Sequence, residues 1–193
     1  GTRIRPDGKH ADVVVRVVEG SKFLLGAITF SGRPIFERKQ LIDALALKPA
    51  AVFTPAAVDE MQRDLQGFYR SKGYFSAVVT EHADRTQAVG GRVPVTFDCQ
   101  PGVQFRVGRI EPRGMDRLSP QFMVKRFQSL SGKVYDPAAI ETRYRELIKT
   151  GLFRGLHVRP TPSGPDTLKL DVEVEEAKTK EIGFDIGYGS YDG

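Results

Sequence analysis

Few residues of this 193-residue chain have the type and spacing that chemistry requires. The three histidines, His10, His82 and His157, lie far apart and form no HxxxH or HExxH pair, which argues against a metal site. The single cysteine, Cys99, excludes an internal disulfide, and it alternates in phase with apolar strand residues, which favours a buried, inert thiol. No serine lies in a GxSxG motif, and no glycine-rich phosphate loop follows a strand. We therefore expect neither enzyme activity nor a cofactor.

The charge of the chain is mildly positive. Lys and Arg number 29 against 24 Asp and Glu, a net charge of +5 that permits an anionic partner without requiring one. Five basic residues fall on the helices expected in the second half of the chain: Lys125, Arg126, Arg143, Arg145 and Lys149. They form either a solvated helix face or a surface attracted to anionic lipid headgroups, an attraction of about 1 kcal/mol per residue close to a membrane.

Composition indicates a folded globular chain. Hydrophobic residues make up 40% and charged residues 27%, which argues against general disorder. No uncharged apolar run approaches the roughly 18–20 residues of a transmembrane helix. The chain opens on polar, strand-like sequence without the basic and apolar start of a signal peptide, so we expect a piece of a longer protein.

An internal repeat organises the sequence. Phe23, Gly26, Ile28 and Gly32 each recur 82 positions later, as Phe105, Gly108, Ile110 and Gly114. The helix start Thr54-Pro55 recurs as Asp136-Pro137, also 82 later, and Gly73 recurs 78 later as Gly151. Several landmarks in one order at nearly one spacing indicate a duplicated structural unit.

Each copy predicts the order strand, helix, helix, strand, strand. The last two strands are expected at 75–82 and 93–99 in the first copy, and at 156–161 and 167–174 in the second. The alternation of the opening strand changes phase at Gly26, and Gly108 takes the same place in the second copy, which predicts a bulge or a close backbone approach. The closing strands alternate apolar and polar residues, so each sheet needs the two helices to cover its apolar face.

Both ends of the chain carry incomplete units. Residues 1–20 contain two short strand-like runs around the turn Pro6-Asp7-Gly8, typical of a hairpin. Near the C-terminus, Ile182, Phe184, Ile186 and Tyr188 alternate with small or polar residues, as in a strand of a transmembrane β-barrel.

The repeated unit resembles the POTRA domains of the BamA/TamA family of outer-membrane protein assembly factors. The resemblance rests on the order of elements, on the run 69–74 after the second helix, on Thr150-Gly151-Leu152-Phe153 and on the run 184–189. The sequence departs from the family at Arg33 and Met115, where asparagine often stands. The resemblance implies an α+β fold of tandem POTRA domains. Residues 1–20 would be the C-terminal hairpin of a preceding POTRA domain, residues 21–101 and 102–178 two POTRA domains, and residues 179–193 the first barrel strand.

The resemblance also implies a function on the periplasmic side of the outer membrane of a Gram-negative bacterium. The chain would bind unfolded outer-membrane proteins and accessory assembly proteins by β-augmentation, and the outer-membrane lipid surface is a further candidate partner. The implied edge strands carry Phe75, Ser76, Ala77, Val78, Val79, Thr80, Leu156, His157, Val158 and Arg159. Short connections at Gly20, Pro101 and Gly102 would act as interdomain hinges.

Two other functions are compatible with the sequence. The first is the POTRA region of a two-partner-secretion transporter, although such transporters usually carry two POTRA domains and the hairpin at 1–20 implies at least three. The second, of a different class, is an RNA-binding module. It is disfavoured because aromatic residues such as Phe97 and Phe105 are in phase with core positions and leave no stacking platform on the open sheet face. We therefore expect no nucleic-acid partner.

Overall fold

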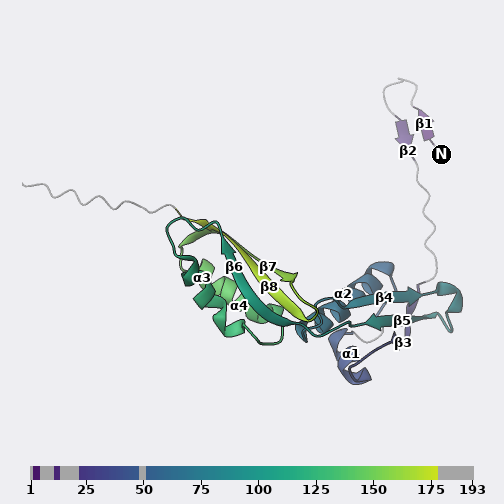
Figure 1. The fold of residues 1–193 in the computed structure, drawn as a ribbon. Helices are drawn as coiled ribbons and strands as arrows, with labels where there is room; N and C mark the ends of the chain where they lie inside the picture. The colour runs from purple at the N-terminus through teal and green to yellow at the C-terminus, as the bar shows by residue number, and fades with distance from the viewer. Residues whose placement is uncertain (1, 5–10, 14–21, 48–50, 178–193) are drawn as a thin grey trace, which may run out of the picture.

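The computed structural model describes residues 2–4, 11–13, 22–47 and 51–177 (Figure 1). At the N-terminus, β1 (Thr2–Ile4) pairs antiparallel with β2 (Ala11–Val13), which agrees with the predicted hairpin. The predicted hinge residue Gly20 and the predicted barrel strand at 179–193 lie outside the described residues. No helix in the described ranges is long and apolar enough to cross a membrane.

The two repeats form two units of the same topology, which lie end to end in Figure 1. The first contains β3 (Leu24–Gly32), α1 (Arg38–Ala44), α2 (Pro55–Ser71), β4 (Val78–Ala83) and β5 (Arg92–Gln100), with a short 3-10 turn at Arg85–Gln87. Its strand order is β3-β5-β4, with β3 parallel and β4 antiparallel to the central β5.

The second unit repeats this order of strands and α-helices, but its 3-10 turn follows the first helix instead of the second strand. It contains β6 (Arg106–Arg113), α3 (Pro120–Phe127), a 3-10 turn at Gln128–Leu130, α4 (Pro137–Ile148), β7 (Phe153–Pro162) and β8 (Thr167–Glu176). The strand order is β6-β8-β7, again with one parallel and one antiparallel pair.

Local sequence signals explain where the long helices begin. The hydroxyl of Thr54 accepts a hydrogen bond from the Ala57 amide at 3.1 Å, and the carboxylate of Asp136 accepts one from the Ala138 amide at 2.9 Å. Proline follows each cap at the first helical position, where its missing N–H costs nothing. The helices pack on the central strands, whose inward side chains are fully buried: Val93, Val95, Phe97, Cys99, Leu168, Leu170 and Val172.

The predicted bulge is confirmed in both units. The pairing of β3 with β5 shifts register between Leu25 and Ile28, and that of β6 with β8 shifts between Val107 and Ile110. At Gly26 the backbones approach so closely that a Cβ atom would lie 2.8 Å from the carbonyl oxygen of Val93.

Two predicted strand starts are wrong by three residues, since β7 begins at Phe153 and not at Leu156, and β4 begins later than expected. The sequence predicts a strand from Phe75, but β4 begins at Val78, so Phe75, Ser76 and Ala77 are not strand residues. They belong to a turn in which the Phe75 amide donates to the Gly73 carbonyl at 3.0 Å and the Ala77 amide to the Tyr74 carbonyl at 3.0 Å. Alternation alone does not reveal this turn, because Phe75 packs into the core of the second unit while Ala77 packs into that of the first.

Candidate protein-binding edges and the joint between the units

The two sheets present four edge strands, and the sequence predicts protein binding at two of them. The predicted binding strands β4 and β7 lie at one edge of their sheets, and β3 and β6 lie at the other. An edge strand offers unpaired N–H and C=O groups to another chain unless it is covered or interrupted. The four edges differ in how far they are protected.

The first half of β3 and of β6 is covered by the chain itself. In the first unit, the Leu25 amide donates to the Ala51 carbonyl at 2.9 Å and the Phe53 amide to the Phe23 carbonyl at 2.9 Å. In the second unit, the Val107 amide donates to the Lys133 carbonyl and the Tyr135 amide to the Phe105 carbonyl, both at 2.9 Å. These short bridges occupy main-chain groups that a docking strand would otherwise use.

The second half of these two edges is protected differently. In the first unit, the guanidinium of Arg38 at the start of α1 donates to the outward carbonyl of Ile28 at 2.8 Å. In the second unit, β6 contains Pro112, which has no N–H to offer.

The β7 edge is interrupted by two prolines. Pro160 and Pro162 pair with Leu170 and Leu168 of β8, two residues apart along the strand. Neither can donate a main-chain hydrogen bond, so the C-terminal half of β7 is a poor template for an added strand. Among the predicted site residues on β7, Leu156 is buried, while His157 and Arg159 are exposed on the open face of the sheet.

The β4 edge contains no proline, and two glutamines of α2 reach it. The side-chain amide of Gln62 donates to the Val79 carbonyl at 2.8 Å, and that of Gln66 donates to the Ala77 carbonyl at 2.9 Å. The carbonyl of Val79 therefore faces away from β5. Since the main-chain direction alternates along a strand, the N–H and C=O of Glu81 face the same open side. Val78 is 54% exposed and Val79 only 2%, so alternate side chains line the open face and the core.

The glutamines and Arg38 were not identified from the sequence. Gln62 and Gln66 are four residues apart on α2, immediately after the buried Met61 and Leu65. That spacing places them on one side of the apolar stripe. Which strand lies beside that side depends on tertiary packing, which the sequence pattern alone does not reveal.

The predicted hinge at Pro101 and Gly102 lies beside a packed joint. Pro101 is buried, and Gly102 has φ +73°, in the left-handed region that favours glycine. Hydrogen bonds cross the joint from the Phe105 amide to the Gly73 carbonyl at 2.8 Å and from the Gln104 side chain to the Lys72 carbonyl at 2.9 Å.

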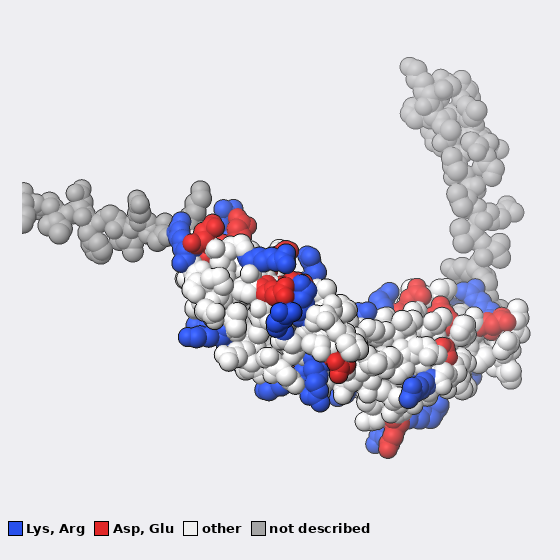
Figure 2. Space-filling model, viewed as in Figure 1, with Lys and Arg blue, Asp and Glu red and all other residues white. Residues whose placement is uncertain are grey.

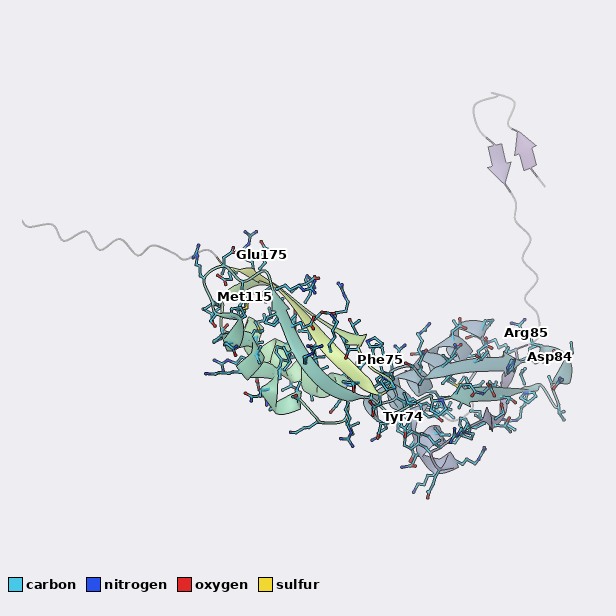
Figure 3. All side chains as sticks on the ribbon, viewed as in Figure 1. Tyr74, Phe75, Asp84, Arg85, Met115 and Glu175 are labelled. Carbon is cyan, nitrogen blue, oxygen red and sulfur yellow. The ribbon has the colours of Figure 1, made fainter. Side chains whose placement is uncertain are left out.

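Two consecutive residues of the first unit pack into different cores. The Tyr74 ring lies 5.9 Å from the Phe36 ring of its own unit. The Phe75 ring instead packs edge-on against Phe105 and Tyr135 of the second unit, at centroid distances of 6.0 and 5.4 Å. Figure 3 labels both residues where the two units meet. The joint is thus an aromatic contact as well as a short connection.

The predicted basic residues do not form one uncompensated patch. Arg143 pairs with Glu146 at 2.7 Å and Arg145 with Glu141 at 2.8 Å, both within α4. The Arg126 guanidinium lies 4.9 Å from the centre of the Phe122 ring. Lys125 and Lys149 are exposed. On the face drawn in Figure 2, positive and negative side chains are interspersed. Lipid attraction by these residues stays a prediction.

The described residues contain no group of three or more histidine, cysteine, aspartate or glutamate side chains that could hold a metal ion. Cys99 is fully buried on β5, as its alternation predicted, and burial raises the pKa of its thiol. A thiol held in its neutral form is a weak nucleophile.

Comparison with known proteins finds a family model that matches the first unit. Residues 23–102 match the POTRA family model, described as "Surface antigen variable number repeat". The chain is 21% identical over 190 residues to the outer membrane protein assembly factor BamA of Buchnera aphidicola subsp. Acyrthosiphon pisum (strain APS). That alignment covers 95% of this chain and 30% of the relative, so the chain spans less than a third of that protein's length.

Solved structures share the fold. The crystal structure of Haemophilus influenzae BamA POTRA3-5 superposes with a TM-score of 0.67 at 18% identity, covering 91% of this chain and 70% of that one. BamA from Haemophilus ducreyi lacking POTRA domains 1-3 gives a TM-score of 0.65 at 15% identity, covering 80% of this chain and 30% of that one. The second unit repeats the topology of the matched first unit. Residues 23–102 therefore match the POTRA family, and over 95% of its length the chain is similar to the outer membrane protein assembly factor BamA.

Proposed function

We propose that this chain is the periplasmic, non-enzymatic binding region of an outer-membrane protein assembly factor. In this role it takes up extended segments of unfolded outer-membrane proteins and of accessory proteins and passes them toward a membrane-embedded barrel. The proposal is supported by the similarity to the outer membrane protein assembly factor BamA and by the shared fold with POTRA1-2 of the periplasmic domain of Omp85 from Anabaena.

The observation that carries the proposal is the state of the β4 edge. Along β4 the main-chain groups of Glu81 face away from the sheet, and no proline interrupts the strand. An extended segment can pair with such an edge through main-chain hydrogen bonds, which tolerate many side-chain sequences. A general assembly factor needs that tolerance, because its clients share strand structure rather than sequence.

A proline at Glu81 tests this binding mode. Glu81→Pro removes an outward N–H and is compatible with an edge strand, whereas Glu81→Ala removes the same carboxylate and keeps the N–H. Binding of a fluorescent peptide copied from an outer-membrane β-strand is measured by anisotropy. We expect Glu81→Pro to weaken binding at least tenfold and Glu81→Ala to bind about as the parent chain does. If Glu81→Pro retains its circular dichroism spectrum and its peptide affinity, binding at this edge is refuted.

A further inference from the structure

We propose that Gln62 and Gln66 are exchangeable caps on the β4 edge, and that a client strand binds by replacing their side-chain amides with its own main-chain N–H groups. This inference rests on the function proposed above. It adds which side chains control access to the edge.

The two glutamines occupy successive acceptors of one edge. They lie four residues apart on α2 and donate to the carbonyls of Val79 and Ala77, at 2.8 and 2.9 Å. Val79 lies in β4 and Ala77 immediately precedes it, and both carbonyls point toward α2 because each accepts a hydrogen bond from one of its glutamines. A docked strand would direct its N–H groups at acceptors with that same two-residue spacing. The glutamine amides therefore stand where the first two hydrogen bonds of an added strand would form.

The exchange replaces like with like. A glutamine side chain carries the same neutral amide donor as a peptide bond, so a carbonyl that loses Gln62 and gains a main-chain N–H keeps an equivalent hydrogen bond. The free glutamine regains its rotamer freedom and is solvated by water. Each capping bond contributes only modestly to stability, and releasing it does not unfold the domain.

The other described edge strands are protected by groups that an added strand could not replace in this way. The first halves of β3 and β6 are bonded to neighbouring main chain, and Arg38 holds Ile28 with a charged donor. The prolines of β6 and β7 lack the N–H altogether. Within residues 22–47 and 51–177, β4 thus combines a proline-free edge with neutral side-chain caps. The two glutamine side chains occupy main-chain acceptors of this edge and so oppose non-specific strand pairing in the absence of a client.

The occupant that fits is an extended segment with alternating apolar and polar side chains. On the open face, the exposed Val78 offers an apolar neighbour to one row of the added strand. The opposite row would face the polar ends of Gln62 and Gln66. Strands of outer-membrane barrels have this alternation. A uniformly polar extended peptide would lack the contact with Val78 and should bind more weakly.

The test compares two variants of α2 with equal numbers of changes. Gln62→Met with Gln66→Met removes both donors while keeping the length and helix propensity of the side chains. The matched control, Asp59→Ala with Arg63→Ala, changes two exposed residues with the same spacing and leaves the net charge unchanged. Anisotropy with the alternating barrel-strand peptide gives the affinity. We expect about tenfold tighter binding for the methionine variant, from the loss of two competing bonds, and no change for the control.

A second measurement uses the unmodified chain. On addition of the peptide, the side-chain NH₂ signals of Gln62 and Gln66 in NMR spectra should move to the positions of solvated glutamine. Unchanged affinity in the folded methionine variant, weaker binding, or unmoved NH₂ signals would each overturn the cap role. These outcomes are separate from the Glu81→Pro test: if that variant loses binding while the methionine variant behaves like the parent, β4 is the binding edge and the glutamines do not control it.

Discussion

A single carboxylate shows how one residue holds a loop of this fold. Glu176, at the end of β8, accepts hydrogen bonds from the backbone amides of Asp116, Arg117 and Leu118, the shortest 2.9 Å from the Leu118 nitrogen. These bonds, led by that of Leu118, lower the pKa of the Glu176 carboxyl. They tie the loop before α3 to the last strand of the domain. Figure 3 shows the neighbouring Met115 and Glu175 at this end of the second unit.

The Glu176 anchor predicts a pH dependence. Because the folded pKa lies below the unfolded value of about 4.3, the anchor stabilises the fold at neutral pH and is lost as the pH falls through the folded pKa. We expect the Leu118 amide chemical shift to titrate below about pH 4.3, and this titration to vanish in Glu176→Gln. Glu175→Gln, which changes an exposed neighbour paired with Arg154, is the control. A Leu118 shift that titrates equally in Glu176→Gln would refute the anchor.

At the scale of elements, local rules explain most of what the sequence could predict. The caps at Thr54 and Asp136, the repeat and the alternation of β5 and β8 are local signals, and each marks an element that the structure contains. The start of β4 and the edge protections were missed because they depend on contacts between elements. The Phe75 ring packs against Tyr135 of the other domain, and Gln62 of α2 donates to Val79, 17 residues further along the chain.

The bulge in β3 predicts a large difference between two glycines. Gly26→Ala would place a methyl group 2.8 Å from the Val93 carbonyl oxygen, and the contact is with backbone, which yields little. We expect a loss of about 1–3 kcal/mol in the free energy of unfolding of the first domain. Gly67→Ala, on α2 with no atom within 4 Å of the added carbon, should instead stabilise by about 0.5–1 kcal/mol. Urea unfolding measures the change in the free energy of unfolding of each variant. Equal changes in the two variants would contradict the close approach of the backbones at Gly26.

At the scale of the whole molecule, the joint between the domains is an aromatic contact rather than a bare linker. The sequence predicts hinges from short connections, and Gly102 has a φ of +73°, in the left-handed region that favours glycine. However, the neighbouring Phe75 packs between rings of the second domain, beside hydrogen bonds to Gly73 and Lys72. We predict that these contacts, and the Phe75 ring above all, restrain bending about Gly102.

Removing that side chain should loosen the joint and leave both domains folded. Phe75→Ala deletes a half-buried ring, so we expect the free energy of unfolding to fall by about 2 kcal/mol. Removing a fully buried phenylalanine ring costs more, about 3–5 kcal/mol. Distances between spin labels placed on α2 and α4 should spread over a wider range, while circular dichroism stays unchanged. Val103→Ala, which shortens a linker side chain that is 50% exposed, should keep the parent distribution. A narrow, unshifted distribution in Phe75→Ala would mean that the main-chain connection through Pro101 and Gly102 holds the domains by itself, because the aromatic contact would then add no restraint.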